Sequence, residues 1–286
     1  MNRFKEMLLI LQRELRRTFR SSRSVVFLLI YALVAGLGAF IFAQVSGLID
    51  ENVTDEMRTM AANANLNVYQ KIVETFFGEE ASSLEWLMSM PPFLLFFYKF
   101  NLLCLPALVV LTCFDQISTE LESGSVRYLA PRVHRSAIVL GKFASSMILV
   151  LALSSLMTAV SLVLMTHSTP TEAGAGAIFL GAARFEAMTM LALLPYLSLT
   201  FLFSSIFRTP LYALMLSACA VLLFWLLGVL ANFESLSFLK WLTPANYEPG
   251  LLSAQITSLL KSSAAFIAFA AVFLGGAILR MNKADL

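Results

Sequence analysis

Long apolar runs separated by polar segments dominate the pattern of this 286-residue chain. Six of the runs are roughly 20 residues long, and a helix of that length rises far enough to cross the roughly 30 Å hydrocarbon core of a bilayer. The expected spans are residues 25–48, 93–114, 143–165, 185–206, 211–231 and 262–279. The pattern therefore predicts an all-α polytopic membrane protein, built as a single transmembrane domain over residues 1–286.

Composition supports this class. Hydrophobic residues make up 59% of the chain and charged residues 13%, which is far from the composition of soluble domains. The three cysteines lie inside apolar runs without paired spacing, so neither a disulfide framework nor a metal site is indicated. The sequence does not fix where the fourth span starts, because residues 177–183 are also apolar and could form an interfacial or re-entrant piece.

The distribution of Lys and Arg predicts the orientation of the spans. With the N-terminus inside, most of the 20 basic residues fall in cytoplasmic segments. The outer loops hold four of them: Arg58, Lys71, Lys240 and Lys261. The first outer loop is instead rich in Asp and Glu. We therefore expect six spans with both termini in the cytoplasm, in the cytoplasmic (inner) membrane of a prokaryote.

The N-terminal segment, residues 1–24, predicts an amphipathic helix. Apolar residues recur at intervals of three or four: Phe4, Leu8, Leu11, Leu15 and Phe19. Arginines occupy the opposite face, an arrangement suited to a helix that lies in the membrane interface and contacts anionic lipid headgroups. Two interpretations stay open: a basic anchor that only enforces topology, or an elbow helix that also transmits movement to the spans.

Two outer segments are longer than simple turns. Residues 50–92 carry apolar residues at helical spacing, which favours a helical hairpin. Residues 232–261 are rich in aromatic residues and proline, a composition typical of short interfacial or re-entrant helices. Segments of this size could also contact an outer accessory protein.

Sequence motifs for catalysis are missing. No G-x-x-x-x-G-K-[ST] phosphate loop occurs, since Gly141-Lys142 is followed by Phe143 and lacks the partner glycine. His134 and His167 are expected on opposite sides of the membrane, so they cannot share a metal. We therefore expect no enzyme activity, no metal and no cofactor in this chain, and no nucleic-acid partner.

The connector between the second and third spans, residues 115–142, is the most informative segment. It holds 28 residues with acidic side chains first and basic ones later, although a turn between two spans needs only a few residues. Its motif is Ile117-Ser118-x-Glu120-x-Glu122-x-Gly124-Ser125-Val126-Arg127, followed by Val133-x-Arg135 and a hydrophobic-Gly141-Lys142 entry into the next span. The length and charge indicate a surface offered to a soluble partner.

This motif resembles the cytoplasmic signature of type-2 ABC transporter permeases. The nearest subgroup is that of the permeases of nitrous-oxide-reductase maturation, gliding motility and sodium export. The resemblance implies the membrane permease subunit of an exporter, with a cytoplasmic coupling helix between spans two and three. It also implies a separate ATP-binding cassette ATPase that holds ATP and Mg²⁺, and a second permease copy or a related permease.

Under this resemblance, the residues expected to couple the permease to the ATPase are Glu120, Glu122, Gly124, Ser125, Arg127 and Arg135. We expect both glutamates to meet a groove on the ATPase, with glycine setting the turn. Reversal of both glutamate charges should then leave the fold intact, because neither residue belongs to a span. The other interpretation is that the glutamates only solvate a loop and cap a helix.

Other classes of transport stay open alternatives. An ion-gradient-driven secondary transporter or channel would place ionisable residues near the membrane midplane, but Lys99, Arg184 and Glu186 are expected toward the outer ends of their spans. An intramembrane enzyme is disfavoured by the missing catalytic groups. Lys99 and Asn101 are candidates for a transport path. Small residues at Ala32 and Gly36 in the first span favour close helix pairing between two permeases.

Overall fold

The described part of the computed structural model is helical throughout and covers residues 3–20, 26, 29–38, 40, 86–87, 90–125, 133–168, 175–231, 233–253 and 255–283. Five helices in it are long and apolar enough to cross a membrane. They are α5 (Pro92–Cys113), α8 (Arg135–Ser168), α9 (Ala175–Ile206), α10 (Pro210–Leu230) and α12 (Ile256–Lys283). The expectation of an all-α, multi-span fold is thus confirmed for these five.

Half of the expected first span, residues 25–48, lies outside the described residues. An apolar helix at Leu29–Gly38 is described there, but it is shorter than a span, so the first span stays a prediction. The expected hairpin in residues 50–92 also lies outside the described residues, apart from its last few positions.

Three spans begin earlier than hydropathy predicts, and one of them, α12, starts at Ile256 rather than at residue 262. Helix α8 starts at Arg135 rather than at residue 143, so the last part of the expected connector is helical. Helix α9 starts at Ala175 rather than at residue 185. Residues 177–183 therefore belong to one continuous helix, and the alternative of a re-entrant piece is wrong.

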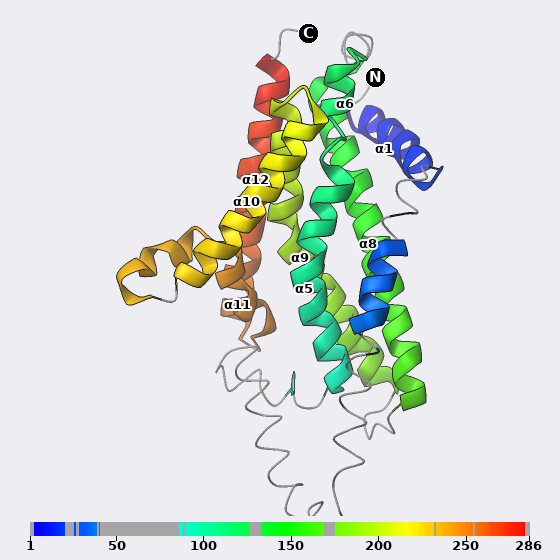
Figure 1. Cartoon of the computed structure of the whole chain (residues 1–286), viewed down its shortest axis with the longest axis vertical. Helices are drawn as coiled ribbons and strands as arrows, with labels where there is room; N and C mark the ends of the chain where they lie inside the picture. Colours follow the sequence, from blue (N-terminus) through cyan, green and yellow to red (C-terminus); the bar gives the residue numbers. More distant parts are fainter. Residues whose placement is uncertain are drawn as a thin grey trace, which may run out of the picture.

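Helix α9 lies at the centre of the bundle and contacts α5, α8, α10 and α12 (Figure 1). One apolar core joins α5, α8, α9 and α12 through side chains such as Leu105, Leu149, Leu197 and Ala277. A second core includes Leu94, Phe185, Leu251 and Phe266, and lies near the starts of α5 and α12. Van der Waals contacts among these side chains stabilise the helix packing, because lipid chains are as apolar as the side chains and removal from lipid adds little.

The aromatic segment between α10 and α12 forms short helices, as expected. These are the 3₁₀-helices η1 (Glu234–Trp241) and η2 (Pro244–Tyr247), followed by α11 (Glu248–Leu252). Helix α10 leans away from the bundle and carries η1 outward with it (Figure 1). Its side chains are the least buried of the five long helices.

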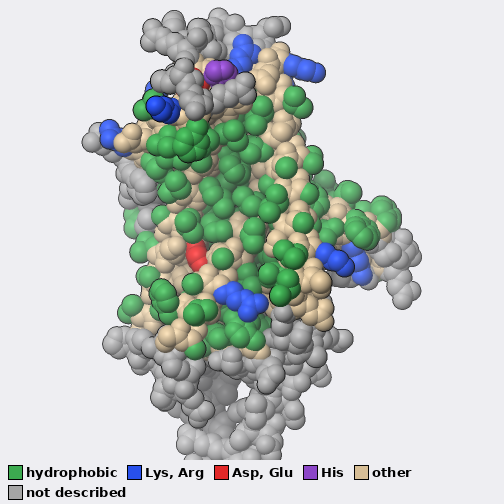
Figure 2. Space-filling view, turned by 180° about the vertical axis from the view of Figure 1, so that it is seen from behind, with side chains coloured by type: hydrophobic (Ala, Val, Ile, Leu, Met, Phe, Trp, Pro, Cys, Tyr) green, Lys and Arg blue, Asp and Glu red, His purple; other side chains and the backbone are tan. Residues whose placement is uncertain are grey.

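Both chain ends lie at one end of the bundle, together with the N-terminal helix α1 (Arg3–Arg20) and the short helix α6 (Ser118–Glu122) (Figure 1). In Figure 2, basic side chains gather at that end, and the middle of the visible face is mostly hydrophobic. This arrangement brings α1 and the connector together, and their contacts form the site described next.

Candidate functional site

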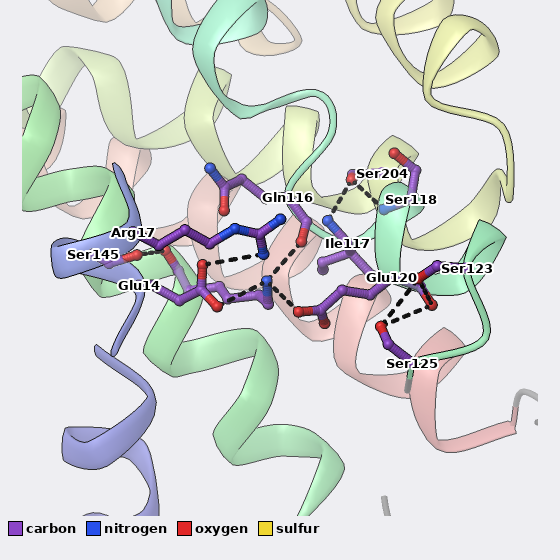
Figure 3. Close-up of polar contacts among 11 residues, drawn as sticks. Glu14, Arg17, Gln116, Ile117, Ser118, Glu120, Ser123, Ser125, Ser145 and Ser204 are labelled. Atoms are coloured by element: carbon purple, nitrogen blue, oxygen red, sulfur yellow. Dashed lines mark hydrogen bonds and ion pairs between the residues drawn. The ribbon is translucent and has the colours of Figure 1, made fainter. Parts of the chain in front are cut away.

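A buried lysine joins three elements at this end of the bundle. Lys142 of α8 is 1% exposed. Its Nζ lies 2.9 Å from Oε1 of Glu120 on α6 and 3.4 Å from Oε1 of Glu14 on α1 (Figure 3). Nζ also donates a hydrogen bond of 2.8 Å to the carbonyl of Gln116. One cation thus holds the N-terminal helix and the connector together, and we call these four residues the Lys142 network.

Helix α1 reaches this network because it packs closely on α8. Glu6, Ile10 and Glu14 are spaced by four residues and share one face of α1. At the contact, a Cβ on Gly141 would stand 2.9 Å from Cγ2 of Ile10 and 3.0 Å from the carbonyl oxygen of Met7. Only glycine leaves room for this approach.

A second polar contact fastens α1 to the connector. Oε2 of Glu6 accepts a 3.0 Å hydrogen bond from the backbone N–H of His134 and lies 3.0 Å from its Nδ1. The backbone hydrogen bond, followed by the imidazole contact, holds the pKa of Glu6 below its ordinary value. The carboxylate is therefore stabilised in its charged form.

Helix α6 is fastened to the central helix α9 as well. Oγ of Ser204 accepts hydrogen bonds from the backbone N–H groups of Ile117, at 3.0 Å, and Ser118, at 3.1 Å. These N–H groups belong to the first turn of α6, where no intrahelical acceptor exists. The start of α6 is thus positioned by a side chain from a neighbouring span.

Helix α6 ends in a turn at Gly124, as expected from the sequence. Gly124 has a φ of 68°, a left-handed conformation that side chains with a Cβ resist. The hydroxyls of Ser123 and Ser125 each lie 3.4 Å from the carbonyl oxygen of Glu120, and they hydrogen-bond each other at 3.2 Å. The turn therefore ends α6 directly after the exposed residues Glu122 and Ser123.

The residues expected to couple the permease to the ATPase differ in burial. Glu120 is buried in the Lys142 network, so the expectation that it meets an ATPase groove directly is corrected. Reversing its charge would bring two ammonium groups together in a buried site, so from the structure we expect that change to destabilise the fold. Glu122 is exposed, and Arg127 lies outside the described residues.

Arg135 also has a partner within the chain. Its Nη1 donates 3.0 Å hydrogen bonds to the carbonyls of Met281 and Asn282. These carbonyls lie in the last turn of α12, where a cation satisfies acceptors that the helix leaves unpaired. Arg135 therefore ties the start of α8 to the end of α12.

The two candidate path residues have different partners. Lys99 lies close enough to Glu248 for the two charges to interact. Asn101 is buried, and its Oδ1 accepts a hydrogen bond from the hydroxyl of Tyr31. Within the described residues, no group of three or more His, Cys, Asp or Glu side chains could hold a metal ion.

Sequence reasoning missed the roles of Glu6, Glu14, Lys142 and Ser204. The spacing of Glu6, Ile10 and Glu14 did carry a signal, because two acids on one face of a basic helix indicate an inward-facing stripe. The partner of that stripe, more than 100 residues further along, was not predictable from local pattern.

The model of the family described as "ABC-2 family transporter protein" matches residues 8–286, nearly the whole chain. No curated protein matches the sequence. The family match includes α1 from residue 8 onward, the connector and the five long helices described above, so the Lys142 network lies within the matched region.

Proposed function

Because the chain belongs to the ABC-2 transporter family, we propose that it is the permease subunit of an exporter whose separate ATPase docks on α6. The chain is a multi-pass membrane protein, and permeases of this family generally work with an ATP-binding cassette ATPase. The observation that carries the docking proposal is the Lys142 network. It ties α6 to α8 and α1, directly beside the exposed residues Glu122 and Ser123.

Movement of α6 would reach the spans through these contacts. The Lys142 network links α6 to α8, and Ser204 links its first turn to α9. The interior of a packed bundle is stiff and close-packed. A partner that shifts α6 would therefore also shift α8 and the central helix α9.

In this proposal, Glu122 is the carboxylate that faces the ATPase, and Glu120 acts by positioning α6. Gly124 and Ser125 shape the turn, and Arg135 holds α8 to α12. Arg127 is proposed as a further contact with the ATPase or with lipid headgroups. ATP and Mg²⁺ would be bound by the partner.

Helix α1 fits an elbow that lies in the membrane interface. Phe4 is 64% and Leu8 48% exposed, whereas Glu6 and Glu14 face α8. The apolar side is thus free to contact lipid while the acidic side binds the protein. We propose that α1 moves with α8 during transport and does more than anchor the chain.

Pairing with a second permease copy or a related permease is proposed as well. A Cβ on Gly36 would meet no atom within 4 Å, while one on Gly38 would contact Phe100 within the chain. The open side at Gly36, together with the exposed side chains of α10, suits close helix pairing. We also propose that Lys99 and Asn101 line the transport path, and that the outer aromatic segment contacts an accessory protein. The proposed subgroup is that of the permeases of nitrous-oxide-reductase maturation, gliding motility and sodium export.

We predict that the end carrying α1 and α6 faces the cytoplasm of a prokaryotic inner membrane. In a background without native cysteines, Ala245→Cys should react with a membrane-impermeant thiol reagent in intact cells. Ser123→Cys and Lys283→Cys should react only after the membrane is opened. Labelling of position 123 in intact cells would place the connector outside and contradict the docking proposal.

We also predict that the tagged wild-type chain, purified in mild detergent, brings with it a soluble protein that carries a phosphate-loop motif. Mass spectrometry of the purified material identifies that protein, and an ATP hydrolysis assay measures its activity. An unrelated six-span membrane protein with the same tag serves as the control. A chain that transports its cargo while no ATPase accompanies it would overturn the proposal.

A further inference from the structure

A carboxylate lies deep within the bundle, away from the Lys142 network. Glu186 is the only Asp or Glu in the five long helices α5, α8, α9, α10 and α12. It lies about 17 Å into α9 by helix rise, because that helix begins at Ala175. The sequence had placed it at the outer end of a span. A charge at hydrocarbon depth is costly to maintain, which marks it as a candidate for function.

Three hydroxyls from the middle of α8 surround this carboxylate. Ser154 and Ser155 donate to Oε1, the latter at 3.3 Å, and Thr158 donates to Oε2 at 3.1 Å. Among the described residues, no Lys, Arg or His forms an ion pair with Glu186. The nearby Arg184 instead lies over the ring of Trp86, at 4.2 Å from its centroid. The negative charge is therefore hydrogen-bonded but is not neutralised by a cation of the described chain.

A small cavity adjoins this group between α5, α8 and α9. Its volume is about 10 Å³, and Asn101, Thr158, Glu186 and Thr189 contribute polar atoms to its lining. A space of this size admits about one water molecule. A primary ammonium is of similar size and carries three N–H donors, as in a lysine side chain. A trimethylated ammonium is too large for it.

The Glu186 residue is half-buried and lies beside the apolar outer surface of α8 and α9. Ser155 is exposed, and so are its neighbours Leu151 and Leu156 on α8 and the residues Ala183 and Ala187 on α9. These exposed leucine and alanine side chains suit contact with lipid chains. A free ion does not enter from hydrocarbon, but a molecule with an apolar tail can keep that tail in the bilayer while its headgroup reaches the carboxylate.

We propose that Glu186, with Ser154, Ser155 and Thr158, binds the primary ammonium group of an amphipathic molecule that arrives from the bilayer. This inference rests on the proposed transport function, because it names the chemical class of the cargo. The ammonium donates to the Glu186 carboxylate, and the hydroxyls hold that carboxylate in place. Charge-assisted hydrogen bonds of this kind are about twice as strong as neutral ones.

The test uses the full chain, without ATPase, in nanodiscs of zwitterionic lipid. Binding of dodecylamine is measured from the shift in thermal unfolding temperature and compared with binding of dodecanol and dodecyltrimethylammonium. The wild-type chain should bind dodecylamine at least tenfold more tightly than either. Glu186→Gln should lose this preference, Glu186→Asp should keep part of it, and Glu122→Gln, a carboxylate removed at the far end, should keep it in full.

Equal binding of amine and alcohol by the wild-type chain would overturn the inference without any variant. A retained preference in Glu186→Gln would overturn it too, because the carboxylate would then not be the recognising group. Co-purification of the ATPase is independent of this measurement. Its loss would count against the proposed function alone, and loss of amine preference would count against the cargo class alone.

Discussion

Replacement of Lys142 by Met is expected to lower the free energy of unfolding by about 3–5 kcal/mol, the cost of breaking a buried ion pair. The change leaves the carboxylates of Glu14 and Glu120 buried without their shared cation. It also leaves the carbonyl of Gln116 without its donor. Both α1 and α6 should loosen, so transport and ATPase association should fall together. Thermal unfolding of the purified variant and ATPase co-purification measure the two effects.

Two controls separate the network from a general loss of charge. Lys283→Met removes an exposed lysine at the same end of the molecule and should change stability little. Combining Lys142→Met with Glu14→Gln and Glu120→Gln removes the unpaired charges, so most of the lost stability should return. The triple variant should still couple poorly, because the cation that joins α6 to α1 and α8 is gone. A fully stable single variant Lys142→Met would show that the network does not hold these helices.

Replacement of Gly141 by Leu is expected to force α1 away from α8. Even a Cβ at this position would stand 3.0 Å from the carbonyl oxygen of Met7, and a backbone atom cannot yield without moving the helix. Overpacking of this kind costs about 1–3 kcal/mol. Both the Glu6–His134 contact and the Glu14–Lys142 pair should weaken, because they depend on the position of α1. Thermal unfolding and protease cleavage within residues 3–20 measure the change.

The matched control for this change is Gly275→Leu. A Cβ at Gly275 would meet no atom within 4 Å, so the variant should be as stable as the wild type or slightly more stable, since glycine is a poor helix former. Equal stability and equal protease resistance of the two variants would mean that close packing at Gly141 does not position α1.

Helix type and approximate bounds follow from hydropathy because membrane-spanning segments must satisfy their backbone groups internally. The pattern placed α5, α10 and the end of α9 within a residue or two of their observed bounds. It failed at the start of α12, and also at the starts of α8 and α9. Arg135, Lys142 and Arg184 lower the local hydropathy there, although each is accommodated in a helix by a partner within the chain.

The site was predictable in part. The connector motif identified Glu120, Gly124 and Arg135 as special, and the left-handed φ of Gly124 agrees with the expected turn. The motif did not indicate that Glu120 faces inward, because α6 is too short for its periodicity to show a buried side. The contact of Glu14 with Lys142 depends on tertiary packing at Gly141, which local pattern does not encode.

The surroundings of Glu186 also depend on tertiary packing that the local sequence pattern does not encode. The sequence correctly left it unpaired with Arg184, since residues two apart do not face each other on a helix. Its hydroxyl partners come from α8, and the sequence does not indicate how α8 and α9 are rotated against each other. The sequence also did not indicate that Glu186 lies several turns inside α9, because the expected span began at residue 185 and the helix begins at Ala175.

The central claim is that a soluble ATPase grips the exposed end of α6. A photo-reactive amino acid placed at Ser123, which is exposed beside the glycine turn, tests it directly in intact cells. The same group at Trp241, 76% exposed on the outer segment, is the control. The account predicts an adduct with a phosphate-loop ATPase from position 123 and none from position 241. An ATPase adduct from 241 alone, or from neither position while transport continues, would contradict it.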